Sequence, residues 1–455
     1  MSSFTDLTGR PGPATWQAGD YYPEDQADFP VAGVSWYEAA AYAEFVKKSL
    51  PTIYHWAAPN LYPSWDVFWP SSIIVPLSNL GSAGALRVGS CEGINFYGVY
   101  DMAGNVREWC LNQALEGRTL RGGAWNDYPY MFSTVTQADP FDRSPKNGFR
   151  CAYYPEPGKI PEAAFGPTLR AKLREYAKER PVSDDVFEVY KRQFSYDKAN
   201  LNVKPEAFKE SEYWIMEKVS FDATYDKERM LAYLFLPKNS KPPFQVVIYF
   251  PGAGALWREA SAISDIPDFD FFLKSGRAVL YPIYKGTHER SEGLPYQTWS
   301  PDGSNRHREY MIKLGKDFSR SIDYLGSRSD MDMHRIAFYG VSWGGAMSPV
   351  LPAIEPRVKA SISVVGGFLG VKSLPEADAL NYTPRVKVPA LMLNGEYDSV
   401  FPYEAYVKPM FNLLGTPAKD KFLKHYPTDH GIPQNEKIKE SLWFLDRYFG
   451  PVKSS

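Results

Sequence analysis

Residues 335–350 read Arg-Ile-Ala-Phe-Tyr-Gly-Val-Ser-Trp-Gly-Gly-Ala-Met-Ser-Pro-Val. An apolar run comes first, and a Gly-x-Ser-x-Gly pattern follows it, with Gly340 and Gly344 two positions on either side of Ser342. Glycine at these two positions allows the chain to turn sharply from a strand into a helix. The stretch therefore predicts a strand, a tight turn that presents the hydroxyl of Ser342, and a helix.

A serine hydroxyl is a weak nucleophile at neutral pH, so catalysis by Ser342 requires a base and an acid that orients the base. Only two histidines follow Ser342, namely His425 and His430. His430 lies in a loop ahead of a helix predicted at 435–449, whereas His425 belongs to a strand pattern. Because a loop residue can reach over the edge of a sheet, His430 is the predicted base.

The predicted acid lies between the serine and this base. The apolar pattern Val388-Pro-Ala-Leu-Met-Leu-Asn leads into the acidic turn Gly395-Glu-Tyr-Asp-Ser. When a triad is built on such a strand-turn-helix unit, the acid follows the serine and precedes the histidine in the chain. Asp398 is the predicted acid, and Glu396, which is nearer the end of the strand, is the alternative.

Attack on a carbonyl leaves an oxyanion, which needs two backbone N–H donors. One comes from the residue after the nucleophile, here Trp343, and the other from the loop after the third strand. The segment Pro251-Gly-Ala-Gly-Ala fits that loop, and the glycines on both sides of Ala253 allow its amide to point inward. Trp343 and Ala253 are the predicted oxyanion donors; an ordinary glycine-rich turn is the alternative for Ala253.

The region 212–455 alternates between apolar, β-branched runs and helical patterns. This alternation predicts an α/β fold with a mostly parallel sheet covered by helices on both faces. The predicted strands lie at 214–225, 230–236, 244–250, 278–284, 335–339, 360–365, 390–393 and 421–426.

Several stretches carry a family resemblance: Tyr249-Phe-Pro-Gly-Ala-Gly, Tyr281-Pro-Ile-Tyr-Lys-Gly-Thr-His-Glu-Arg, Lys316-Asp-Phe-Ser-Arg-Ser-Ile-Asp-Tyr-Leu and Tyr339-Gly-Val-Ser-Trp-Gly-Gly. They resemble the dienelactone-hydrolase and prolyl-oligopeptidase-like branch of the α/β-hydrolases. The resemblance implies a serine carboxylesterase that forms an acyl-enzyme and uses no cofactor. A peptidase or amidase is the first alternative, and a binding protein with an incidental hydrolase fold is the second. The excursion at 285–310, with Tyr296 and Trp299, is expected to be a lid or a pocket wall.

Residues 1–155 carry a second resemblance. The stretches are Pro30-Val-Ala-Gly-Val-Ser-Trp-Tyr-Glu-Ala-Ala-Ala-Tyr-Ala, Tyr97-Gly-Val-Tyr-Asp-Met-Ala-Gly-Asn-Val-Arg-Glu-Trp, Arg121-Gly-Gly-Ala-Trp and Gly148-Phe-Arg-Cys-Ala. They resemble the formylglycine-generating enzyme family, which implies an irregular α+β domain. Active members bind copper through two cysteines shortly after the Arg-Gly-Gly-x-Trp motif, yet residues 126–133 contain none. A noncatalytic module is therefore expected, with a helix that begins after Ser35.

The same resemblance implies a structural calcium ion on the turn around residue 105. Asp101 and Glu108 would supply carboxylates, and Gly104 and Val106 would supply carbonyl oxygens. Hard oxygen ligands on a tight turn suit calcium. An acidic cluster without a metal is the alternative.

Composition and charge limit the remaining possibilities. The 455 residues suggest two or three domains, and helical spacing at 156–211 predicts a helical linker between the two regions. Lys plus Arg (51) nearly balances Asp plus Glu (53), which favours neither nucleic acid nor an anionic membrane as a partner. Three cysteines without a CxxC pair suit a reducing, cytoplasmic compartment. A small-molecule ester is the expected partner.

Overall fold

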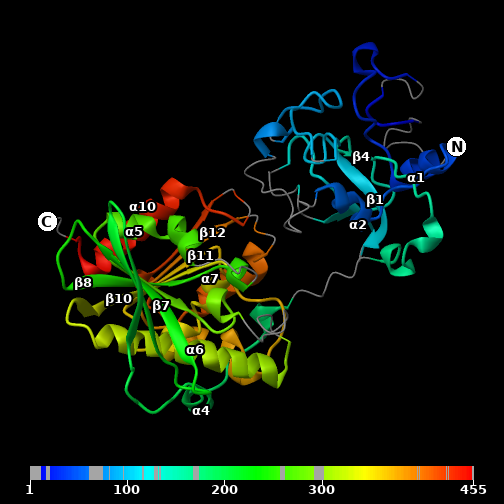
Figure 1. Cartoon of the computed structure of the whole chain (residues 1–455). Helices are drawn as coiled ribbons and strands as arrows, with labels where there is room; N and C mark the ends of the chain where they lie inside the picture. The colour runs from blue at the N-terminus through cyan, green and yellow to red at the C-terminus, as the bar shows by residue number, and fades with distance from the viewer. Residues whose placement is uncertain are drawn as a thin grey trace. The chain divides into compact units, whose positions relative to one another are not determined.

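The computed structural model divides into two compact units, residues 1–172 and 173–455, and each is described by itself (Figure 1). The described residues are 12–16, 21–60, 75–80, 82–95, 97–114, 117–127, 132, 135–167, 174–256, 262–291, 302–396, 398, 400–426, 428 and 430–452.

The second unit is built on one sheet with the strand order β13-β12-β11-β10-β8-β9-β7-β6-β5. The strands are β5 (Lys204–Glu210), β6 (Trp214–Asp222), β7 (Arg229–Pro237), β8 (Phe244–Phe250), β9 (Ala278–Ile283), β10 (Met331–Val341), β11 (Ala360–Val364), β12 (Ala390–Gly395) and β13 (Lys421–Tyr426). Strands β8 to β13 pair in parallel, whereas β5, β6 and β7 are antiparallel to their neighbours. This is the predicted α/β-hydrolase fold.

The central strands are buried on both faces. Every residue of β8, which reads Phe-Gln-Val-Val-Ile-Tyr-Phe, is buried. Ile248 and Phe250 belong to one apolar core, and Val247 and Tyr249 belong to another. Continuous apolar runs of this kind are typical of parallel strands that are covered by helices on both sides.

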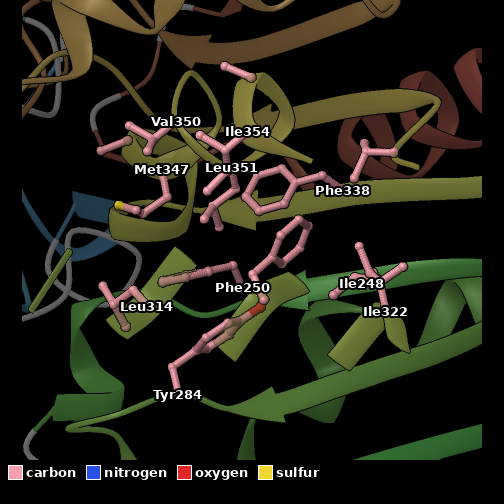
Figure 2. Packing of buried hydrophobic residues seen from close by; sticks show 14 of the residues in the cluster. Ile248, Phe250, Tyr284, Leu314, Ile322, Phe338, Met347, Val350, Leu351 and Ile354 are labelled. Atoms are coloured by element: carbon pink, nitrogen blue, oxygen red, sulfur yellow. The ribbon is translucent and has the colours of Figure 1, made fainter. Parts of the chain in front are cut away.

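Helices close these two cores on opposite faces of the sheet (Figure 1). The first core is covered by α4 (Asp184–Arg192), α6 (Asn305–Gly326), α7 (Trp343–Met347), α8 (Leu351–Ile354) and α9 (Lys408–Leu413), and the second by α5 (Asp270–Lys274) and α10 (Gln434–Phe449). Figure 2 shows the first core, where Ile248, Phe250 and Phe338 of the strands meet Leu314 and Ile322 of α6. Among the described residues, no helix combines the length and the apolar character that crossing a bilayer would require.

The segment 156–211, expected as a helical linker, is organised differently. It contains 3-10 turns at Pro157–Lys159, Glu162–Ala164 and Tyr176–Lys178, the helix α4, and the strand β5. Prolines at several positions, including Pro161 and Pro181, interrupt any continuous helix. Strand β5 is exposed along its whole length because it is the charged edge of the sheet, so it shows no apolar alternation. From residue 173 onward the segment is part of the second unit.

The first unit is a small, irregular α+β domain, as the sequence predicts. Its sheet has the order β3-β2-β1-β4, and its elements are α1 (Trp36–Phe45), α2 (Ile53–Ala57), β1 (Arg107–Ala114), β2 (Gly117–Arg121), β3 (Thr136–Ala138) and β4 (Asn147–Gly148). Ser35 caps α1 through a reciprocal pair of hydrogen bonds with Glu38. The predicted helix start is therefore confirmed.

Candidate active site

The turn at Ser342 is strained and depends on glycine. Ser342 follows β10 directly and has φ 55° and ψ −108°, a conformation that costs a residue with a side chain about 1–3 kcal/mol. A Cβ atom on Gly340 would lie 2.2 Å from the carbonyl oxygen of Gly344, and one on Gly344 would lie 2.2 Å from that of Phe250. Both glycines of the pattern are thus required by the close approach of backbone.

Backbone hydrogen bonds hold this turn between the neighbouring strands. The amide of Ser342 donates to the carbonyl oxygen of Val364 at 2.8 Å, and the amide of Gly344 donates to that of Pro251 at 3.0 Å. Val364 ends β11, and Pro251 follows β8. The strained serine is therefore fixed at the carboxyl edge of the sheet, where parallel α/β sheets bind their ligands.

Three predicted residues meet at this edge in a continuous chain of hydrogen bonds. Ser342 Oγ lies 2.8 Å from His430 Nε2, and His430 Nδ1 lies 2.7 Å from Asp398 Oδ2. Nδ1 of His430 thus faces a carboxylate oxygen and Nε2 faces the serine hydroxyl. With the proton on Nδ1, donated to the carboxylate, Nε2 can take the proton of Ser342.

Asp398 is held in place by the backbone that follows it. Its Oδ1 accepts hydrogen bonds from the amides of Val400 at 2.8 Å and Phe401 at 3.0 Å, and its side chain is fully buried. The ring of Phe401 is also buried and lies 5.8 Å from the ring of His430. Phe401 was not among the predicted site residues, because a phenylalanine three positions after an aspartate carries no distinctive sequence signal.

The two alternatives considered for the acid and the base lie outside this chain of hydrogen bonds. His425 is on β13, and its Nδ1 lies 3.8 Å from Glu396 Oε2. The side chains of both residues are more than 40% exposed. They form a separate surface pair.

The predicted oxyanion donors both begin a helical turn beside the serine. Trp343 is the first residue of α7, and Ala253 is the first residue of a 3-10 turn at Ala253–Leu256. The first N–H groups of a helix have no acceptor within that helix. The loop of Ala253 also approaches the nucleophile, because a Cβ atom on Gly252 would lie 3.6 Å from the Cβ of Ser342. This geometry is compatible with an oxyanion site formed by the two amides.

The predicted lid is described only at its two ends. Tyr296 and Trp299 lie outside the described residues. At the near end, Arg290 Nη1 binds Asp317 Oδ2 of α6 at 2.6 Å. Asp317 is completely buried, and this burial raises the pKa of its carboxyl group. The start of the excursion is therefore anchored to α6 by a buried ion pair.

The two carboxylates expected to bind calcium already have hydrogen-bond partners in the protein. Both carboxylate oxygens of Glu108 are bound by Arg150, at 2.5 and 2.6 Å, and one also accepts from Trp56 Nε1 at 2.6 Å. Asp101 accepts a hydrogen bond from the amide of Gly89 at 2.7 Å. The described residues contain no cluster of three potential metal-ligating His, Cys, Asp or Glu side chains. The calcium site at Asp101, Gly104, Val106 and Glu108 therefore stays a prediction, although the guanidinium group of Arg150 already neutralises the carboxylate of Glu108.

The three cysteines of the first unit form no disulfide bond with one another. Cys91, Cys110 and Cys151 are all free thiols. Burial raises the pKa of each of them, most strongly that of Cys110. Copper binds soft thiolate ligands, and a raised pKa disfavours the thiolate.

Comparison with known proteins supports the two-part reading of the chain. Residues 64–154 match the sulfatase-modifying factor enzyme 1-like domain, and residues 230–441 match the dienelactone hydrolase family. The inactive C-alpha-formylglycine-generating enzyme 2 of Bos taurus is 30% identical over 154 residues, which cover 28% of this chain and 51% of that protein. The serine/threonine-protein kinase pkn1 of Chlamydia caviae is 33% identical over 150 residues, 28% of this chain and 24% of that protein.

One curated relative of the second unit is an acetyl esterase. Acetyl esterase Axe7A of Xylanibacter ruminicola is 24% identical over 255 residues, covering 48% of this chain and 56% of that protein. The structure of an acetyl xylan esterase from Paenibacillus sp. R4 aligns with a TM-score of 0.47 and 18% identity, over 59% of this chain and 96% of that one. The chain spans only about a quarter to just over half the length of these curated relatives. It therefore combines a sulfatase-modifying-factor-like domain near its N-terminus with a dienelactone hydrolase domain in its C-terminal half.

Proposed function

We propose that the second unit is a serine hydrolase that cleaves carboxylic esters through an acyl-enzyme. The observation that carries this proposal is the pair of hydrogen bonds that joins Ser342 to His430 at 2.8 Å and His430 to Asp398 at 2.7 Å. A histidine placed between a serine hydroxyl and a buried carboxylate is the arrangement that activates a serine as a nucleophile.

The reaction uses these groups in sequence. Ser342 Oγ attacks the ester carbonyl while His430 Nε2 takes the hydroxyl proton, and Asp398 stabilises the imidazolium through Nδ1–H. The amides of Trp343 and Ala253 bind the oxyanion of the tetrahedral intermediate. His430 then protonates the leaving alcohol, and a water molecule activated by the same histidine releases the acid. All of the groups in these steps are protein atoms or water.

Esters are proposed ahead of peptides because the hydrolase domain has esterase relatives. A peptidase or amidase would use the same triad, so the two are separated by substrate rather than by geometry. Aryl esters and the matching aryl amides test this directly. Hydrolysis of the amide at a kcat/KM comparable with that of the ester would favour the peptidase alternative.

The first unit is proposed to be a noncatalytic binding or packing module. Its free thiols lie outside the positions at which active relatives bind copper. Both carboxylate oxygens of Glu108 accept hydrogen bonds from Arg150. Its role would then be to recognise a partner or to support the hydrolase.

Replacement of the nucleophile tests the proposed function. Ser342→Ala should lower the turnover of an aryl acetate by about 10⁴- to 10⁶-fold and abolish labelling by a fluorophosphonate, because the covalent route is lost. Ser348→Ala is the matched control, since Ser348 is a buried serine at the other end of α7. Turnover that survives in a folded Ser342→Ala protein would contradict the assignment.

A further inference from the structure

A small cavity lies against the helix that begins at the proposed nucleophile. Trp343, Ala346 and Met347 of α7 line it, and Val350 follows in the same wall. Its volume is about 30 Å³, which is room for roughly two water-sized groups. The cavity is thus one residue away from Ser342 along the chain and is narrow.

The walls of this cavity are mainly apolar and firmly packed. Met311 of α6 and Leu369 of the loop after β11 face it together with Met347. The ring of Trp343 packs edge-on against Phe250, with ring centroids 4.9 Å apart, and is only 3% exposed. Figure 2 shows Met347 among the side chains of the surrounding core. An apolar space with fixed walls suits an alkyl group better than a polar one.

One wall is contributed from outside the region that matches the dienelactone hydrolase family. We call residues 174–194 the strap. Tyr176 of the strap lines the cavity and is 3% exposed. Its hydroxyl donates to the carbonyl oxygen of Leu369 at 2.7 Å, and its ring stacks on Phe368 with centroids 4.1 Å apart. The strap therefore holds the loop of Leu369, which also lines the cavity.

Arg174 fastens the strap to the same loop. Its Nη2 lies 2.7 Å from Asp378 Oδ2 and its Nε lies 2.7 Å from Glu179 Oε1, while its guanidinium group lies 4.3 Å from the centre of the Tyr176 ring. The side chains of Arg174 and Asp378 are at most 7% exposed. Because two carboxylates already neutralise Arg174, this charge is unavailable to recognise an anionic acyl group.

We propose that this cavity receives the alkyl part of the substrate's acyl group, and that Tyr176 of the strap and Met347 of α7 limit that group to two or three carbon atoms. The assignment rests on the proposed ester hydrolysis at Ser342. It makes the strap a determinant of substrate choice, although the strap precedes the hydrolase family match at 230–441.

The test uses the full chain and two series of probes. The first series is p-nitrophenyl acetate, butyrate and hexanoate. The second is ethyl p-nitrophenyl methylphosphonate and hexylphosphonate, with which Ser342 Oγ forms a P–O bond, p-nitrophenolate leaves and His430 takes the hydroxyl proton. The variants are Met347→Ala and Tyr176→Leu, with Met216→Ala as the matched control, because Met216 is equally buried but belongs to the core on the other face of the sheet.

The wild type should prefer the acetate, because each methylene that does not fit a pocket lowers kcat/KM by about tenfold or more. Met347→Ala and Tyr176→Leu should each raise the hexanoate-to-acetate ratio of kcat/KM by about tenfold, while Met216→Ala leaves this ratio unchanged. A ratio that stays at the wild-type value in a folded Met347→Ala protein would overturn the proposal, as would an equal shift in Met216→Ala.

The phosphonates separate this proposal from the proposed function. In the wild type, Ser342 should be labelled faster by the methylphosphonate, and in Met347→Ala the preference should shift towards the hexylphosphonate. This result supports the cavity assignment even if no ester is turned over, in which case only the proposed ester hydrolysis is wrong. Labelling that is independent of chain length in the wild type and in both variants overturns the cavity assignment while leaving the nucleophile intact. Absence of any labelling of Ser342 overturns both.

Discussion

Replacement of Asp398 by asparagine isolates the function of the buried carboxylate. The Oδ1 of the new side chain can still accept from the amides of Val400 and Phe401, which now bind Asp398 at 2.8 and 3.0 Å, so the turn should keep its shape. The NH₂ group then faces His430 Nδ1, where Oδ2 now lies at 2.7 Å. Because that group donates, Nδ1 must become the acceptor and the proton of the imidazole moves to Nε2.

With its proton on Nε2, His430 can no longer accept the hydroxyl proton of Ser342. We therefore expect Asp398→Asn to lower kcat for an aryl acetate by about 10⁴-fold, which corresponds to roughly 5.5 kcal/mol of transition-state free energy. Glu396→Gln is the control and should leave kcat nearly unchanged, because Glu396 is 42% exposed and lies 3.8 Å from His425, outside the triad. Thermal unfolding should show that both variants are folded. Equal losses in the two variants, or a small loss in Asp398→Asn, would refute the role assigned to Asp398.

Four further predictions concern the turn at Ser342, the first unit and the start of the hydrolase. Gly344→Ala should abolish activity and destabilise the protein, because the new Cβ would lie 2.2 Å from the carbonyl oxygen of Phe250; activity and thermal unfolding of the purified variant test this. Chelation with EDTA should leave the unfolding temperature unchanged. Arg150→Gln should lower the free energy of unfolding of the first unit by about 3–5 kcal/mol, because Glu108 would be left buried and unpaired, and denaturant unfolding measures this. A protein that starts at residue 174 should label at Ser342, but one that starts at residue 212 should be insoluble or unfolded; fluorophosphonate labelling of the soluble fraction distinguishes them.

The sequence predicted those features of the fold and site that depend on local chemistry. The turn at Ser342 needs glycine on both sides, and Asp398 and His430 stand in loops after apolar strands, so each leaves a signal within a few residues of itself. The arrangement of the parallel strands followed from their continuous apolar runs, since strands covered on both faces have no polar alternation.

Other features of the structure carry no signal in their own residues. Glu108 fits the calcium motif in isolation, and only the structure shows that Arg150, 42 positions later, occupies its carboxylate. Strand β5 is fully exposed and charged, so nothing in its own residues indicates that it pairs with β6. Pairing with a neighbouring strand overrides the weak strand propensity of these charged residues. The segment predicted as a helical linker contains short turns, one helix and strand β5, and its prolines, such as Pro161 and Pro181, are local interruptions of a continuous helix.

The strap is part of the folded hydrolase, so the N-terminal boundary of this folding unit lies before it. Phe187 and Phe194 are buried, and their rings pack edge-on against Tyr382 with centroids 5.4 and 6.0 Å apart. Removal of one such phenylalanine typically costs about 3–5 kcal/mol, so loss of both would consume most of the roughly 5–15 kcal/mol that stabilises an ordinary domain. Tyr382 belongs to the same loop region as Asp378, which Arg174 of the strap binds. The strap therefore contributes both to the stability of the second unit and to the shape of the cavity. A protein that starts at residue 212, or at the start of the family match, would lack the strap and lose both contributions.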